Sequence, residues 1–300
     1  MAAAAGRVKL REAIDPLVLA VDVGSTASRG DVYDAAGRPV QGGREKVPHH
    51  FTTRDGGAMR VLVHSTPQEI PSGLWCYRVD GSLLGGAVND VGRVVSWLQS
   101  MVRFLPGDDF NLILAAAPQA STPIVLPYFS GERSTGWAAN ARAVFAGVSA
   151  ATTGALLSRG AMEGVAISYA RIADQLRSVA GQPQLILASG RVTQDLPAWL
   201  QILADVLEAT VIPVTIKRST LRGTALIALD VMAPDVARTA SATGKIRQPV
   251  ADRAAPYRAR KQDYQALCGA AIALAGAEPR PQSGIVGRAS SPLRRATSGK

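Results

Sequence analysis

The second half of the chain alternates between short apolar runs and longer segments with helical periodicity. The pattern predicts a long helix over about 150–179, strands over 185–188 and 211–215, and helices over about 196–207 and 221–232. Strands that alternate with amphipathic helices are typical of an α/β fold, because the helices cover the faces of the sheet. No other feature of the sequence restricts the architecture so strongly, and we predict an α/β lobe here.

Earlier in the chain, apolar runs and turn residues predict strands instead. Residues 17–23 form a nearly continuous apolar run that ends in a small polar loop, as a buried strand does. Residues 41–57 show no sustained period, and we expect the first structural unit to end there. The remaining predicted elements are hairpins around 30–40 and 73–88, a helix capped by Asn89 or Asp90 with an apolar stripe at Val91, Val94, Val95, Leu98 and Met101, a strand over 124–129, and a helix near 255–274.

The formal net charge of +10 raises the question of a nucleic-acid partner. Five basic residues and no acidic one lie within residues 279–300, so this segment supplies +5 of the +10. It is rich in Pro, Ser, Gly and Arg, which cannot bury enough apolar area to offset the entropy of ordering. We predict a disordered tail rather than a nucleic-acid arm, because no aromatic residue is interleaved to stack on a base.

Cysteine usage and hydropathy indicate the compartment. Cys76 and Cys268 lie far apart and predict reduced thiols rather than a disulfide framework or a metal site. The N-terminal residues carry charge up to Pro16, without the apolar core of a signal peptide. Nowhere does an uninterrupted apolar stretch reach the length of about 18 residues that a membrane span needs. We therefore expect a cytoplasmic protein with no membrane partner.

A candidate phosphate site follows the first predicted strand. Asp22 stands at the strand end, where a carboxylate can hold a hydrated Mg²⁺. Gly24 lets the backbone come close to a phosphate, and the hydroxyls and amides of Ser25 and Thr26 can donate to its oxygens. The same residues would also make an ordinary loop with a capped turn, so the motif alone leaves both interpretations open.

Several segments together resemble a known family. The segment AVDVGSTASRGDVYDAAGRPV is similar to the opening phosphate-binding hairpin of the FGGY carbohydrate kinases, which share the fold group of actin and hexokinase. Later segments resemble successive blocks of that family's second lobe, in the same order and spacing, and are closest to its gluconate kinase-like branch. These segments are GLWCYRVDGSLLGGAVNDVG, LPYFSGERSTGWAANARAVFAGV, RGAMEGVAISYARIADQL, LILASGRVTQDLPAWLQILADVL and STLRGTALIAL. The resemblance implies an actin/hexokinase-like (ribonuclease H-like) α/β fold that binds ATP and Mg²⁺.

The resemblance also implies where the nucleotide lies. Ser189, Gly190 and Arg191 match the family's loop under the adenine and ribose, where small residues let a purine lie against the backbone. Arg191 stands where that loop usually has a second glycine. Its guanidinium could contact the nucleotide, or its bulk could fill the pocket.

Other matched positions carry alternatives. Gly131, Glu132 and Arg133 resemble a loop that faces the cleft, but a solvated or paired turn would look the same. Glu163 matches an acidic position of the family on the long helix, and a solvated or helix-paired acid is the alternative. Trp199 is expected in the core rather than at a ligand, because it lies within an apolar helix stripe.

The first lobe departs from the family pattern. Residues 50–55 are followed almost at once by residues 57–60, which resemble those just after the family's second phosphate loop. The segment that normally lies between, with the general-base aspartate and the sugar contacts, has no counterpart, so we assign no catalytic residue. Asp55 in its glycine turn predicts a turn former rather than a replacement. A hairpin left without neighbouring strands would be marginal in water.

The expected organisation is an N-terminal extension over 1–16, a truncated first lobe with the phosphate-binding hairpin over 17–60, a nucleotide-binding second lobe over 61–235, a helical segment over 236–278 and the basic tail over 279–300. Two hypotheses follow. The first is an ATP-dependent, gluconate-like carbohydrate kinase that transfers the γ-phosphate to a sugar or sugar-acid hydroxyl, with homo- or hetero-oligomers allowed. The second is a catalytically inactive remnant that binds nucleotide or a partner subunit.

Overall fold

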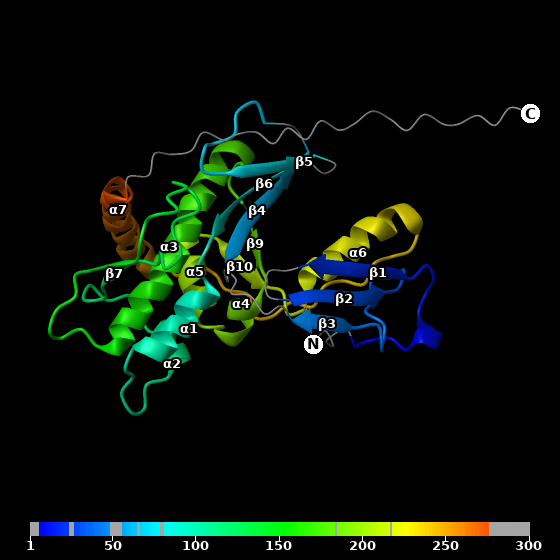
Figure 1. Cartoon of the computed structure of the whole chain (residues 1–300), viewed down its shortest axis with the longest axis horizontal. Helices are drawn as coiled ribbons and strands as arrows, with labels where there is room; N and C mark the ends of the chain where they lie inside the picture. The colour runs from blue at the N-terminus through cyan, green and yellow to red at the C-terminus, as the bar shows by residue number, and fades with distance from the viewer. Residues whose placement is uncertain are drawn as a thin grey trace, which may run out of the picture.

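The computed structural model describes residues 6–23, 27–48, 56–64, 67–78, 81–183, 185–216 and 218–275. These residues form two bodies, each with a hydrophobic core of its own (Figure 1). The smaller body holds strands β1 (Val18–Val23), β2 (Ala27–Tyr33) and β3 (Glu45–Pro48), which are covered by helix α6 (Ser219–Met232). The larger body holds the other helices and strands around a long central helix, α3 (Gly154–Ala180).

The smaller body is a three-stranded antiparallel sheet in the order β1-β2-β3. The predicted turn after β2 is present, and the amide of Gly37 donates to the carbonyl of Asp34 over 2.8 Å. The first sheet ends within the expected range 41–57, since β3 pairs with β2 and the next strand in the chain belongs to another sheet, but β3 itself was not predicted. The hairpin is therefore not isolated: Leu221 and Ala225 of α6 pack on one face of its strands.

Residues 6–16, expected as an extension, pack against this sheet. Val8 forms a parallel bridge with Val40, and the carbonyl of Ile14 accepts the amide of Ala35 over 2.8 Å. A short 3₁₀ turn, η1 (Leu10–Glu12), connects the two contacts. The segment is thus part of the smaller body.

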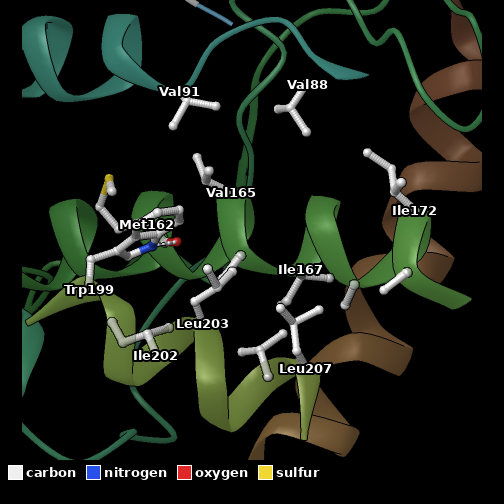
Figure 2. Close-up of a cluster of buried hydrophobic side chains, with 14 of the residues drawn as sticks. Val88, Val91, Met162, Val165, Ile167, Ile172, Trp199, Ile202, Leu203 and Leu207 are labelled. Carbon is white, nitrogen blue, oxygen red and sulfur yellow. Dashed lines mark hydrogen bonds between the residues drawn. The ribbon is translucent and has the colours of Figure 1, made fainter. Parts of the chain in front are cut away.

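The larger body contains two sheets that α3 and its neighbours cover. Strands β4 (Gly57–Val63), β6 (Ser82–Val88) and β5 (Trp75–Arg78) form an antiparallel sheet in that order, and β9 (Leu185–Ala188) pairs in parallel with β10 (Thr210–Pro213). Helix α3 packs on β4 and β6 with one side and on α5 (Trp199–Leu207) with another. Figure 2 shows Val165 and Ile167 of α3 between Val88 and Val91 above and Leu203 and Leu207 of α5 below.

Small residues allow α3 to approach a second antiparallel pair, β7 (Ile124–Leu126) and β8 (Val144–Ala146). A Cβ atom on Gly164 would lie 2.0 Å from the carbonyl oxygen of Val125, so only glycine permits this contact. The C-terminal helix α7 (Ala251–Leu274) then packs over β7 and α5. Burial raises the pKa of Tyr264 on α7 to about 12, so this phenol stays neutral and donates to the hydroxyl of Tyr128 over 3.2 Å.

Most elements predicted for the second half are confirmed, with boundaries shifted by a few residues. The helix expected over 196–207 begins later, as α5 at Trp199, because the residue before Pro197 is disfavoured in helical conformation, and the short helix α4 (Arg191–Asp195) before it was not predicted. The sequence pattern missed β4, β8 and α2 (Phe110–Ala115), which are short or lack a clear period. Among the helices that the structure describes, none has both the length and the apolar character of a membrane span.

The predicted helix after Asn89 and Asp90 is present as α1 (Gly92–Met101), but its predicted cap is wrong. Val91 occupies the cap position and makes no side-chain cap bond. The carboxylate of Asp90 instead accepts the amide and the hydroxyl of Ser130, over 2.6 and 2.5 Å. Met101, expected in the buried stripe, is 67% exposed because it lies at the last turn.

Candidate functional site

One face of the β1–β2 hairpin changes from apolar to polar along its length. Residues that pair directly across antiparallel strands point to the same side of the sheet. Val18 pairs with Tyr33 at the apolar end, which packs against α6, and Asp22 pairs with Arg29 near the other end. Asp31 lies between these two pairs on the same face and is buried. The half-buried Asp22 therefore lies on the α6 side of the hairpin, at its polar end.

The residues that begin α6 hold this polar end. Arg218 precedes the helix in left-handed backbone conformation, with φ of 67°. Its guanidinium donates to the carbonyl of Gly30 over 3.3 Å and lies 3.7 Å from the carboxylate of Asp31. Arg7 binds the same carboxylate with two hydrogen bonds, of 3.0 and 2.5 Å. Burial lowers the pKa of Arg218, and the neighbouring charge of Arg44 lowers it further.

The loop after β9 meets the same helix start. The hydroxyl of Ser219 donates to the hydroxyl of Ser189 over 3.4 Å. Gly190 follows with φ of +125°, and a Cβ atom built on it would meet nothing within 4 Å. Both Ser189 and Gly190 are exposed. The loop thus presents bare backbone to open space, in a conformation that favours glycine.

Arg191 does not fill this space. Its guanidinium turns along α4 and forms an ion pair with Asp195 over 3.1 Å, and the side chain is 93% exposed. The alternative in which its bulk occupies the pocket therefore has no support in this geometry. A surface pair of this kind stabilises little and can be broken at small cost.

The loop with Gly131, Glu132 and Arg133 is organised internally. Gly131 has φ of +94°, and a Cβ atom there would lie 2.4 Å from the carbonyl oxygen of Ala139. The buried carboxylate of Glu132 accepts the amide of Gly136 over 2.9 Å and a guanidinium hydrogen bond from Arg171 over 3.3 Å. Arg133 is exposed. Glu132 is thus paired within the structure, as the alternative interpretation expected. The cleft-facing role of the loop stays a prediction.

Glu163 and Trp199 are buried. Glu163 is fully buried and forms ion pairs with Arg159, at 2.8 Å, and with Arg260, at 2.7 Å. The solvated alternative is therefore wrong and the helix-paired one is confirmed, with a second partner from α7 that local sequence did not indicate. Trp199 is 2% exposed, and its indole donates to the carbonyl of Met162 over 2.9 Å (Figure 2). Its prediction as a core residue is confirmed.

Three predicted phosphate contacts, Gly24, Ser25 and Thr26, and the turn residue Asp55 lie outside the described residues. The structure does bring together the hairpin that carries Asp22 and the loop that carries Ser189, since both contact the start of α6. Sequence reasoning missed Arg218, Ser219 and Asp31. An acidic residue on the buried face of a strand, such as Asp31, indicates that a cationic partner lies nearby. The local sequence does not show which residue that partner is.

The polar end of the hairpin suits a metal ion that takes most of its ligands from water and from substrate phosphates. Among the described residues, no group of three or more His, Cys, Asp or Glu side chains could enclose a metal ion. Mg²⁺ commonly keeps several waters and binds through one or two carboxylates together with substrate phosphates. The single carboxylate of Asp22 at the strand end fits that second arrangement.

Comparisons with known proteins place these features in a family. The model described as the FGGY family of carbohydrate kinases, C-terminal domain, matches residues 59–230. The glycerol kinase of Rhodopirellula baltica is 29% identical over 146 residues, 48% of this chain and 27% of that protein. The glycerol kinase of Nocardia farcinica is 27% identical over 188 residues, 58% of this chain and 37% of that protein. This chain therefore spans only about a third of the length of these relatives.

Solved structures agree in fold. The gluconate kinase from Lactobacillus acidophilus superposes with a TM-score of 0.65 and 25% identity, over 75% of this chain and 47% of that one. A ligand-bound xylulose kinase from the same organism gives the same values. The fold is thus actin/hexokinase-like, with one lobe represented far more completely than the other.

Proposed function

Because the chain belongs to the FGGY family of carbohydrate kinases, we propose that it binds magnesium ATP between the β1–β2 hairpin and the loop after β9. One observation carries the proposal: α6 begins where these two segments meet, with Arg218 bonded to Gly30 and Ser219 bonded to Ser189. The first contact holds the strand pair that carries Asp22, and the second holds the glycine loop. A nucleotide needs both a phosphate cradle and an open surface for its purine.

Each group then has a role. Asp22 holds Mg²⁺ through water, while Gly24, Ser25 and Thr26 hold the β- and γ-phosphates. Ser189 and Gly190 admit the adenosine, and Arg191, whose side chain is exposed on α4, is free to turn toward it. The metal, when bound with the nucleotide, neutralises charge that develops on the transferred phosphoryl group.

The acceptor we propose is a sugar or sugar-acid hydroxyl, and gluconate is the first to test. Transfer needs a general base beside the acceptor oxygen, and a missing base typically lowers the rate by about 10² to 10⁴. The two buried carboxylates of the hairpin and its turn are not free for this work, since Asp31 is bound by Arg7 and Asp34 by Arg38. Burial alone would raise the pKa of Asp34, but hydrogen bonds from Arg38 and from the amide of Ile14 together lower it, so this carboxylate accepts a proton even less readily.

This observation favours a second candidate function for the chain on its own, which is nucleotide binding without transfer. The chain covers only 47% of the gluconate kinase that it matches. In this case the chain binds nucleotide or a partner subunit, and the base comes from elsewhere or is lacking.

Calorimetry on the whole chain tests the proposal first. We expect magnesium ATP to bind, and Asp22→Ala to weaken binding by about tenfold, as the loss of a charge-assisted contact does. With EDTA present, the two proteins should bind ATP equally, because Asp22 acts through the metal. Asp263→Ala, which removes an exposed carboxylate on α7, is the control and should match the wild type. Equal affinity of wild type and Asp22→Ala in magnesium would refute the role of Asp22.

A turnover assay separates the two candidates. The chain is incubated with magnesium ATP and gluconate, with glycerol and xylulose in parallel, and sugar phosphate is measured. ATP binding together with turnover of one acceptor supports the kinase. ATP binding with no turnover of any acceptor supports the binding module instead.

A further inference from the structure

Arg218 occupies its position at an energetic cost. Its backbone has φ of 67°, in the left-handed region, where a residue other than glycine is strained. The side chain is only 11% exposed, so its charge is also largely desolvated. Its side chain makes no cap hydrogen bond to α6, so side-chain capping does not explain why the guanidinium lies there.

Neutralising Asp31 does not explain it either. Arg7 already binds both carboxylate oxygens of Asp31, whereas Arg218 lies 3.7 Å from one of them. Arg44 adds a further positive charge near Arg218. Two guanidiniums, of Arg7 and Arg218, therefore lie at the carboxylate of Asp31, with Arg44 near Arg218, and the surplus charge lies beside the strand pair that carries Asp22. The directed contact that Arg218 makes is its hydrogen bond to the carbonyl of Gly30.

Consecutive residues thus reach two segments that are far apart in sequence. Arg218 bonds to β2 across 188 positions, and Ser219 bonds across 30 positions to the loop after β9. Ser219 bonds from the first residue of α6 in the smaller body to a loop of the larger body, whereas Arg218 fixes the start of α6 on β2 within the smaller body. Movement of either contact would change the spacing between hairpin and loop.

We infer that Arg218 is a positioning residue that, with Ser219, sets the spacing between the phosphate-binding hairpin and the loop after β9, which we call the purine loop. This inference rests on the proposed function. One ATP molecule spans both segments, so its affinity depends on that spacing. Adenosine or tripolyphosphate alone touches only one segment, so its affinity does not. Arg218 contributes to ATP binding through this coupling, in addition to any attraction that its charge exerts on phosphate.

The test compares three probes by calorimetry on the full chain: magnesium ATP, adenosine and magnesium tripolyphosphate. For Arg218→Met, which keeps an apolar stem, we expect ATP affinity to fall at least tenfold more than tripolyphosphate affinity, with adenosine within about twofold of wild type. Arg44→Met removes an exposed neighbouring charge without the contact, so it should weaken ATP and tripolyphosphate by the same factor. Ser219→Ala tests the other contact, keeps α6 intact and should show the same selective loss for ATP.

Equal factors for ATP and tripolyphosphate in Arg218→Met and in Ser219→Ala would overturn the inference while leaving the proposed function in place. If Arg218→Met does not fold, as judged by circular dichroism, Ser219→Ala decides the result alone. Absence of ATP binding to the wild type would overturn both.

Discussion

At the scale of single residues, the buried carboxylate of Glu163 has the most demanding surroundings. It lies within α3 and pairs with Arg159, one turn earlier, and with Arg260 of α7. The hydroxyl of Tyr257 donates to it over 3.3 Å. Each guanidinium also donates to backbone carbonyls, Arg159 to Ile113 and Arg260 to Thr122 and Pro123. Glu163 therefore links α3 to α7 through buried charges.

Replacing Glu163 by Gln should be strongly destabilising, because two buried guanidiniums lose their counter-charge. The expected loss in the free energy of unfolding is about 3–5 kcal/mol, measured by urea denaturation. Asp195→Asn breaks the exposed pair with Arg191 instead and should change stability by less than about 0.5 kcal/mol. A loss below about 1 kcal/mol for Glu163→Gln would show that the charges are not dependent on one another.

At the scale of elements, two helical glycines differ in what surrounds them. One allows close packing, and the other only lowers the helix propensity of its segment. In α3, a Cβ atom on Gly164 would lie 2.0 Å from the carbonyl oxygen of Val125, whereas on α7 a Cβ atom on Gly269 would meet nothing within 4 Å. Gly164→Ala should therefore force α3 away from β7 and cost about 1–3 kcal/mol or more. Gly269→Ala should stabilise by about 0.5–1 kcal/mol, because alanine favours the helix.

Thermal unfolding of both variants checks this pair, with opposite shifts in Tm expected. A stabilising Gly164→Ala would contradict the close contact between α3 and β7. A destabilising Gly269→Ala would show that this face of α7 is covered in solution. Helix α7 lies beyond residues 59–230, which the family model matches, yet its buried Tyr257, Tyr264 and Cys268 make it part of the main core.

At the scale of the whole molecule, the two cores differ greatly in size. The smaller one consists of Ala20, Tyr33, Leu221 and Ala225, with Val18 packed against it, whereas the larger one extends from β4 to α7. Small cooperative units open more readily than large ones. The β1–β3 sheet and α6 should therefore exchange amide hydrogens sooner than α3 and α5.

Leu221→Ala should loosen the smaller body alone. Deleting a buried leucine side chain costs about 2–5 kcal/mol, and here the loss is confined to one core. Hydrogen exchange is expected to speed up in β1, β2 and α6 and to stay unchanged in α3 and α5. Leu203→Ala, in the larger core, is the matched control and should speed exchange in α3 and α5 instead. Faster exchange everywhere in Leu221→Ala would mean that the two bodies unfold as one.

Local sequence determined much of this protein. Periodicity predicted α3, β9 and α6 within a few residues, because a helix or strand repeats its apolar positions at a fixed interval. It also predicted that Trp199 is a core residue, and the order of several matched segments indicated the family. The three-residue strand β8 was missed, since so short a segment carries too little periodicity to separate a strand from a loop.

Tertiary structure alone decided where the charges and the last helices belong. Nothing local selects Arg260 for Glu163 or Arg218 for Gly30, because many arginines along the chain could fill either position. Packing makes the choice by bringing together residues 188 positions apart, as in the contact between Arg218 and β2. The same holds for α6, whose apolar face fits any sheet and whose place on β1 depends on which surface the folded chain leaves uncovered.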